Sequence, residues 1–256
     1  MANSRSANVL PAPVPAPLPP NTGEGYQIRP FYLCVDVSGS MGAIPHEGSP
    51  PVIDLINDDL TSVLQLIHDE LEISEVIKMA MVTFADTATV VLPLSNPDTV
   101  EAMPTLQATG TTSYLQPLRK LREVIAADFQ NRKPHRWFRP VVFFISDGYP
   151  NVETDAEWQA ARDDLLDPGW EPHPIFAVFG FGNAKADVIK TLASGQKYTG
   201  LSCLAPEGQS PRTQLKRIIE LVQLSMVSTA KDPEQFGIQF KDEFILLSRP
   251  GDDVLG

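Results

Sequence analysis

Short apolar runs alternate with amphipathic stretches over most of the chain. Five runs have the length and composition of strands, and the run at 139–146 is almost free of polar residues, which is typical of a strand covered on both faces. The five runs are 30–37, 76–84, 87–94, 139–146 and 174–181. Elsewhere apolar residues recur every three or four positions, as on one face of a helix. The predicted helices are 49–71, 115–129, 155–167, 185–194 and 210–228.

This alternation predicts an α/β fold, because successive strand, helix and strand segments usually form a right-handed parallel crossover. We expect a doubly wound, mostly parallel central sheet with helices on both faces. The connection between 76–84 and 87–94 is very short, which predicts a hairpin and therefore one antiparallel edge strand. Residues 195–203 are a candidate for a further edge strand.

The two ends of the chain depart from this alternation. Residues 11–20 contain six prolines, which favour an extended segment that builds no core. We therefore predict a disordered proline-rich arm at 1–25, one folded domain at 26–228 and a tail at 229–256. Within the tail, the apolar run 244–247 fits either an added edge strand or a segment docked in a groove.

Composition narrows the functional classes. The chain has 256 residues and a formal net charge of −12, which argues against nucleic-acid or anionic-membrane binding. No apolar run is long enough for a membrane span, and the first residues lack the apolar segment of a signal peptide. Cys34 and Cys203 are the only cysteines, too few for a disulfide framework. A cytoplasmic, reducing location is the simplest expectation.

Candidate chemistry begins where the first predicted strand ends, in the sequence FYLCVDVSGSMG. Asp36, Ser38 and Ser40 follow one another at alternate positions, so an extended chain places them on one side. In a parallel α/β sheet, ligands bind at the carboxyl ends of the strands, where the chain order reverses. A carboxylate and two hydroxyls are hard oxygen ligands, which suit Mg²⁺, Ca²⁺ or Mn²⁺ rather than Zn²⁺.

Two further segments offer oxygen donors at comparable places. VVFFISDGYPN ends a central apolar strand at Asp147, and ATGTTSYLQPL places Thr111 and Thr112 in a glycine-bearing loop before a helix. These three segments are far apart in sequence, but the predicted fold brings all of them to the same edge of the sheet. Their convergence is a stronger signal than any one of them.

The three segments resemble the metal-ion-dependent adhesion site of von Willebrand factor A domains. DVSGSM is similar to that family's Asp-x-Ser-x-Ser signature, and FFISDGYPN to its aspartate-glycine after a central strand. TGTTSYLQPL is similar to the family's loop threonine, which is followed six residues later by a helix leucine; this spacing selects Thr112. The chain departs from the pattern at Thr111, where the family usually has a second glycine. The resemblance covers about residues 28–228 and implies the family's Rossmann-like fold.

The resemblance also implies roles for the five residues. Ser38 and Ser40 would bind the ion, expected to be Mg²⁺ with Mn²⁺ or Ca²⁺ as alternatives, through their hydroxyls. Thr112 would bind it directly or through water, and Asp36 and Asp147 would act mainly through bound waters. One coordination position would stay open for the carboxylate of an Asp or Glu on a protein partner. The resemblance therefore implies an interaction module and not an enzyme.

Within that family the sequence of these segments is most similar to that of intracellular bacterial members of the tellurium-resistance type. The resemblance implies a cytoplasmic adaptor, with a link to kinase or phosphatase systems that no residue here indicates. An assembly subunit with a vestigial metal site is the alternative, and metal-dependent partner binding would distinguish the two.

Two other interpretations of the motif fit the sequence less well. Asp, Ser and Gly form ordinary turns, but a turn does not explain the other two segments. The sequence SGSMG is one residue away from the Gly-x-Ser-x-Gly elbow of serine hydrolases, with Ser40, Asp147 and His173 in the matching order. However, Ser38 stands where glycine would be needed, and His173 precedes a predicted strand, at the opposite edge of the sheet from Ser40.

Overall fold

The computed structural model describes residues 27–45, 47–69, 75–132, 136–206, 208–231 and 245–248. The predicted proline-rich arm lies outside these residues, as does most of the predicted tail. None of the described helices is long and apolar enough to cross a membrane.

The described strands form a single mixed sheet with the order β3-β2-β1-β5-β6-β7-β8, and the short strand β4 pairs with the start of β1. Their bounds are β1 (Gln27–Asp36), β2 (Ile77–Phe84), β3 (Ala88–Ser95), β4 (Arg136–Trp137), β5 (Val141–Ser146), β6 (Ile175–Gly180), β7 (Leu201–Leu204) and β8 (Ile245–Ser248). The inner strands run parallel, and β3 is antiparallel to β2, as the hairpin prediction requires. The predicted α/β architecture is therefore confirmed.

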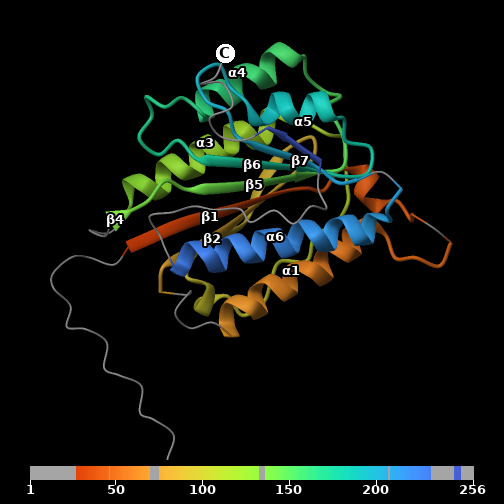
Figure 1. Cartoon of the computed structure of the whole chain (residues 1–256), viewed down its shortest axis with the longest axis horizontal. Coiled ribbons are helices and arrows are strands. Elements are labelled where there is room, and N and C mark those ends of the chain that lie inside the picture. Colours follow the sequence, from red (N-terminus) through yellow and green to blue (C-terminus); the bar gives the residue numbers. More distant parts are fainter. Residues whose placement is uncertain are drawn as a thin grey trace, which may run out of the picture.

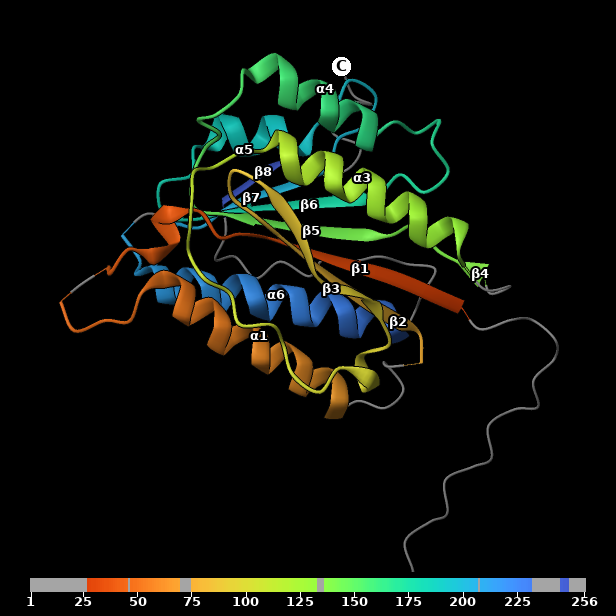
Figure 2. The same ribbon diagram turned by 180° about the vertical axis from the view of Figure 1, so that it is seen from behind.

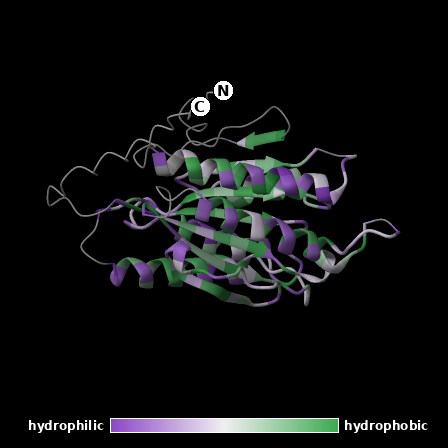
Figure 3. Ribbon diagram, turned by 90° about the horizontal axis from the view of Figure 1, so that it is seen from below, coloured by the Kyte–Doolittle hydropathy of each residue, from purple (hydrophilic) through white to green (hydrophobic). Residues whose placement is uncertain are grey.

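Helices cover both faces of the sheet. They are α1 (Val52–Asp69), α3 (Leu115–Gln130), α4 (Asp155–Leu165), α5 (Ala186–Ala193) and α6 (Pro211–Lys231), with 3-10 turns η1 (Gly39–Gly42) and η2 (Pro97–Thr99). Figures 1 and 2 show α1 and α6 on one face and α3, α4 and α5 on the other. The helices carry hydrophilic and hydrophobic stretches in alternation, while the strands are mainly hydrophobic (Figure 3).

The period of two along β1 divides the core into two layers. Phe31, Leu33 and Val35 belong to the cluster packed against α1 and α6, whereas Tyr32 and Cys34 belong to the cluster on the other face. All five side chains are fully buried. A strand covered on both faces has no solvent-facing positions, which explains its continuous apolar sequence.

Sequence signals at the helix starts are satisfied by local bonds. Thr154 precedes α4 and forms a capping box with Glu157, whose carboxylate accepts the backbone N–H of Thr154. The α6 helix begins at Pro211, where a missing N–H costs nothing, and the hydroxyl of Ser210 accepts the N–H of Thr213. These caps fix where the loops at the carboxyl edge of the sheet end.

Residues 245–247 of the apolar run 244–247 lie in an edge strand, because β8 pairs antiparallel with β7. This pairing adds a second antiparallel strand at the edge opposite β3, so β7, expected as an edge, has neighbours on both sides. The buried hydroxyls of Ser202 and Ser248 lie 2.6 Å apart, and Ser248 also donates to the carbonyl of Gly200 at 2.9 Å. These bonds fix β8 to the sheet.

Candidate metal-binding site

The candidate site lies at the point where the strand order reverses. The chain crosses from β1 to β2 on one side, and β5 lies on the other side of β1. Val35 pairs with Ile145, so Asp36 and Ser146 end two neighbouring parallel strands at the same edge. Such a switch point is where open α/β sheets bind ligands. The topology thus brings the predicted segments of Asp36 and Asp147 together.

The carboxylate of Asp36 is fully buried and has partners on both oxygens. Its Oδ1 accepts the backbone N–H of Ser38 at 2.8 Å, and its Oδ2 accepts the hydroxyl of Ser146 at 2.6 Å. The first bond shapes the turn after β1, and the second joins β1 to β5. Asp36 therefore holds the two strand ends in position.

The two serines and Asp147 form a connected row of oxygens. Ser38 Oγ lies 3.1 Å from Ser40 Oγ, and the hydroxyl of Ser40 donates to Asp147 Oδ1 at 2.8 Å. Ser38 and Asp147 are buried, whereas Ser40 is exposed. The exposed hydroxyl of Ser40 thus links two buried groups and brings the row to the surface.

Thr112 reaches this row through the loop before α3. The N–H of Gly39 donates to the carbonyl of Gly110 at 3.0 Å, and the N–H of Thr109 donates to the carbonyl of Val37 at 2.7 Å. Thr112 is buried, and its Oγ1 lies 3.6 Å from the position that a Cβ on Gly148 would occupy. Thr111 is exposed. Of the two threonines, Thr112 is therefore the one whose hydroxyl lies beside the Asp147 loop.

Gly110 is the residue of this loop that must be glycine. Its φ is +70°, and a Cβ would lie 2.1 Å from Asp86 Oδ1. Thr111, like every other described non-glycine residue, has a φ outside the left-handed region. A second glycine after Gly110 is therefore not needed to form this loop.

Several residues that the sequence analysis did not single out fix the loop after β5. Asn151 donates its N–H to the carbonyl of Thr112 at 3.0 Å, and the carboxylate of Glu153 accepts the N–H groups of Tyr114 and Leu115 at 2.6 and 2.9 Å. These bonds connect the loops of Thr112 and Asp147. The only sequence signal was their place in the same two loops, since bonds between distant segments leave no local pattern.

The buried Tyr114 ties the site to the core. Its hydroxyl donates to the carbonyl of Gly148 at 3.0 Å and lies 3.3 Å from Ser146 Oγ. The ring packs edge to face against the indole of Trp158, with centroids 5.9 Å apart. The position of the Gly148 backbone is thereby coupled to aromatic packing under α4.

The electrostatics of the site penalise its negative charges. Burial, together with the nearby Asp36 carboxylate, raises the pKa of Asp147 to about 6, against the opposing bond from Ser40. Burial also raises the pKa of Asp36, although the bonds from Ser146 and Ser38 lower it. Two carboxylates in a buried setting favour a compensating positive charge.

The donor set fits a hard divalent cation. It comprises two carboxylates and three hydroxyls, all oxygen, as Mg²⁺, Mn²⁺ and Ca²⁺ prefer. Among the described residues, no three His, Cys, Asp or Glu side chains gather as a metal cluster. The arrangement thus relies on hydroxyl groups, and it lacks the nitrogen and sulfur ligands typical of zinc sites.

The structure does not bring His173 together with Ser40 and Asp147, as a hydrolase triad would require. His173 precedes β6, so it lies at the amino edge of the sheet, and its Nδ1 is 2.8 Å from the carbonyl of Trp170. Ser40 instead lies at the carboxyl edge and donates to Asp147. His173 and Ser40 are thus at opposite edges of the sheet.

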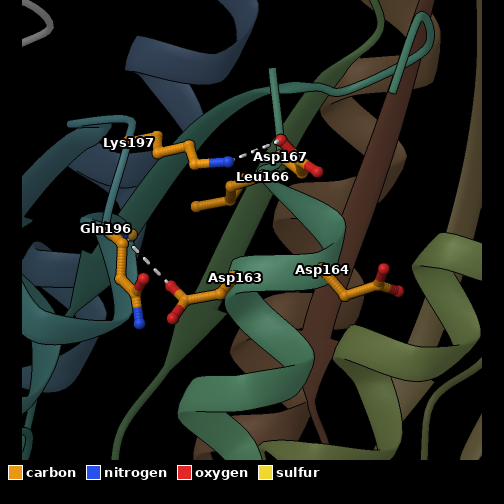
Figure 4. A pocket seen from close by; sticks show the side chains of 7 residues that line it. Asp163, Asp164, Leu166, Asp167, Gln196 and Lys197 are labelled. Carbon is orange, nitrogen blue, oxygen red and sulfur yellow. Dashed lines mark hydrogen bonds and ion pairs between the residues drawn. The ribbon is translucent and has the colours of Figure 1, made fainter. Parts of the chain in front are cut away.

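An acidic recess also lies at the opposite edge, between the end of α4 and the loop 195–197 (Figure 4). Asp163 accepts bonds from Arg162 and from the N–H of Gln196, and Lys197 lies 3.8 Å from Asp167. Asp163 and Asp167 therefore have partners within the fold. The recess is a structural junction between α4 and the loop after α5.

Comparison with known proteins agrees with this architecture. Residues 31–150 match the family model of the von Willebrand factor type A domain. The fold is that of a von Willebrand factor type A domain. The matched region contains all five residues of the candidate site. Domains of this family commonly mediate protein–protein interaction. No curated protein gives a significant sequence match.

Solved structures share the von Willebrand factor type A fold at low sequence identity. Proximal thread matrix protein 1 from the mussel byssus has a TM-score of 0.55 and 14% identity over 80% of this chain and 49% of its own. The PilB minor pilin of Streptococcus sanguinis has a TM-score of 0.53 and 12% identity, over 78% of this chain and 62% of its own. The SpRpn10 VWA domain gives 0.50 and 14%, with 83% of this chain and 100% of its own covered. The present chain thus spans about half the length of the mussel protein and less than two thirds of the pilin.

Proposed function

We propose that this protein is a metal-dependent protein-interaction module. The observation that carries the proposal is the row of oxygens from Ser38 through Ser40 to Asp147, at 3.1 and 2.8 Å, beside the buried Thr112. Three loops distant in sequence supply these groups, and backbone bonds hold the loops together. The buried carboxylates of Asp36 and Asp147 would gain from a cation there.

Mg²⁺ is the expected ion, and Mn²⁺ or Ca²⁺ would also suit the donors. Ser38 and Ser40 would bind it through their hydroxyls, Thr112 directly or through water, and Asp36 and Asp147 mainly through water. When bound, the ion supplies a strong electrophilic point for an anionic oxygen. Ser40, the exposed member of the row, would leave such an ion accessible from the surface.

The partner is expected to be a protein that contributes an Asp or Glu carboxylate. An ion held mostly by neutral hydroxyls and water keeps a strong affinity for an anion. At longer range the net charge of −12 repels acidic ligands, so recognition would depend on the short-range carboxylate. We expect no catalytic activity, because the hydroxyls act as ligands and His173 lies at the other edge of the sheet.

We further propose a cytoplasmic adaptor of the bacterial tellurium-resistance type, working with a kinase or phosphatase system. The sequence of the three motifs supports this branch, and two buried cysteines, Cys34 and Cys203, are too few for a disulfide framework and suit a reducing compartment. Domain limits of 26–228 with flanking arm and tail belong to the same proposal. An assembly subunit with a vestigial metal site is the alternative if the partner binds without metal.

Titration calorimetry with Mg²⁺ or Mn²⁺ tests the proposal. We expect one site in the wild type and binding weaker by about tenfold or more in Thr112→Ala and Asp147→Asn, as for ligands and their supporting groups elsewhere. Thr111→Ala is the matched control, because the adjacent Thr111 is exposed, and it should bind as the wild type does.

Equal metal binding by Thr112→Ala, Asp147→Asn and the wild type would refute the assignment of these ligands. A pull-down with Mg²⁺ against one with chelator then decides between the adaptor and the assembly subunit. Covalent labelling of Ser40 by a fluorophosphonate, lost in Ser40→Ala, would contradict the non-enzymatic interpretation.

A further inference from the structure

Exposed apolar side chains occur in the loops that carry the candidate metal site. Among the described residues, five large apolar side chains are exposed, and three of them lie in loops at the carboxyl edge: Ile44 (61% exposed), Tyr149 (47%) and Val152 (57%). The other two are Leu224 on α6 and Ile245 on β8. Single exposed apolar residues are ordinary, but three beside one polar site are typical of an interaction surface.

Each of the three residues is tied closely to a site residue. Ile44 lies four positions after Ser40, in the loop that projects from the sheet edge between η1 and α1 (Figures 1 and 2). Tyr149 lies two positions after Asp147. Val152 follows Asn151, whose N–H is bonded to the carbonyl of Thr112. We call Ile44, Tyr149 and Val152 the apolar rim.

A positive charge lies against this rim. Lys185, just before α5, is exposed, and its Nζ lies 4.4 Å from the ring centroid of Tyr149. Within the described part of the chain, Lys185 forms no ion pair with a carboxylate. On a protein with a net charge of −12, an unpaired lysine beside the site favours an anionic ligand at this edge.

From this arrangement we infer that the site binds a short protein segment in which an acidic residue has apolar sequence neighbours. The carboxylate would occupy the open metal position, while the flanking side chains cover Ile44, Tyr149 and Val152. Lys185 adds attraction for the acidic group. The inference rests on the proposed function and adds the chemistry of the partner, because a metal–carboxylate contact alone does not select among acidic residues.

The geometry gives the flanking residues a direct role in affinity. An exposed apolar side chain releases free energy when a partner covers it, on the order of 25 cal/mol per Å² of apolar surface buried. The rim residues come from the same two loops that supply the oxygen row, one after β1 and one after β5. A segment that places its carboxylate at the metal therefore meets loops that carry exposed apolar side chains.

Three capped peptides provide the test, with the full-length protein and Mg²⁺ in an NMR titration: Gly-Leu-Asp-Leu-Gly, Gly-Ser-Asp-Ser-Gly and Gly-Leu-Asn-Leu-Gly. We expect the leucine-flanked aspartate peptide to bind at least about fivefold tighter than the serine-flanked one. Tyr149→Ser and Val152→Ser should reduce that ratio toward one. Leu224→Ser is the matched control, since Leu224 is also exposed (41%) but lies on α6, and it should leave the ratio unchanged.

The remaining outcomes separate the inference from the proposed function. If both aspartate peptides bind equally and chelator abolishes the binding of both, the apolar rim does not contribute to recognition, and the metal–carboxylate contact is retained. If the leucine-flanked peptides bind equally with Asp or Asn, or with chelator, both the inference and the metal–carboxylate contact fail. If no peptide binds up to about 5 mM, the inference fails, while calorimetry with the ion alone still tests the metal site.

Discussion

At the scale of single residues, the site consists of charges whose burial is unfavourable. Asp36 is fully buried and Asp147 nearly so, and burial raises the pKa of both carboxyl groups. Four bonds from hydroxyl and backbone groups hold the row in place without a balancing positive side chain among them. The residues are thus arranged to gain stability from a cation, at the cost of stability without one.

This arrangement predicts a particular pH dependence of the metal-free protein. Because the folded-state pKa of Asp147 is about 6, above the usual value of 3.8, its contribution favours folding below about pH 4 and is lost as the pH rises through about 6. The loss is about 3 kcal/mol from this group alone. Denaturation of wild type in chelator, compared with Asp147→Asn at each pH, measures the difference.

Addition of Mg²⁺ should recover most of that stability at pH above about 7 and little of it below about 5, where the carboxyl group is protonated. Identical pH profiles for wild type and Asp147→Asn in chelator would show that the charge of Asp147 carries no such penalty.

At the scale of elements, the site depends on how three loops hold one another. The loop of Gly110 is bonded to the turn after β1 through Gly39 and Val37, and the loop after β5 is bonded to it through Asn151. At the candidate site, none of the three loops is held by the regular hydrogen bonds of a strand. Their mutual bonds replace these, so a local change in one loop is expected to affect the others.

Gly110→Ala tests this dependence. The substitution requires a left-handed backbone and forces the exposed Asp86 carboxylate to move, so we expect a loss of about 2 kcal/mol in the free energy of unfolding. Gly208→Ala is the matched control: its φ is +79°, but no described atom lies within 4 Å of its Cβ position, so about 1 kcal/mol is expected.

Chemical denaturation measures both losses. Adding Asp86→Ala to Gly110→Ala should recover the part due to the clash and leave the backbone strain. Equal losses at the two glycines would argue against a role for the contact with Asp86.

At the scale of the whole molecule, the sheet ends in an antiparallel strand on each side. The strand β3 forms one edge of the sheet and β8 forms the other. Each parallel strand between them is therefore paired on both sides. Exposed strand edges favour unwanted pairing with other chains, and the short length of β8 and the proline Pro93 within β3 limit such pairing at the two edges. The strand β8 is attached to β7 through a short ladder and the hydroxyl of Ser248.

Ser248→Ala should therefore destabilise the protein by about 1–2 kcal/mol, because it leaves the buried hydroxyl of Ser202 and the carbonyl of Gly200 without this partner. Ser95→Ala, at the end of β3, is the control, since within the described part of the chain its hydroxyl bonds only to the nearby carbonyl of Pro93 at the surface. Its effect should stay within about 0.5 kcal/mol. Thermal unfolding measures both, and equal effects would argue that β8 is not fixed by this serine.

Features of this molecule that have a local cause can be predicted from the sequence. The apolar run 139–146 predicts a buried central strand because such a strand has no polar face. It does not predict that β8 pairs with β7, since a short apolar run fits a strand or a groove equally well. Likewise Asp36, Ser38 and Ser40 stand out by their spacing, whereas the bond from Ser146 to Asp36 exists only because β1 and β5 are neighbours. The metal at these residues stays a prediction.

The contact between Tyr114 and Trp158 has an optical consequence. The Tyr114 hydroxyl holds the backbone at Gly148, next to Asp147, and its ring lies against the indole of Trp158. The emission of an indole depends on its immediate surroundings, so a shift of the Asp147 loop changes the light emitted by a ring that solvent does not reach. The protein thus contains a reporter of its own site, readable in natural, unlabelled material.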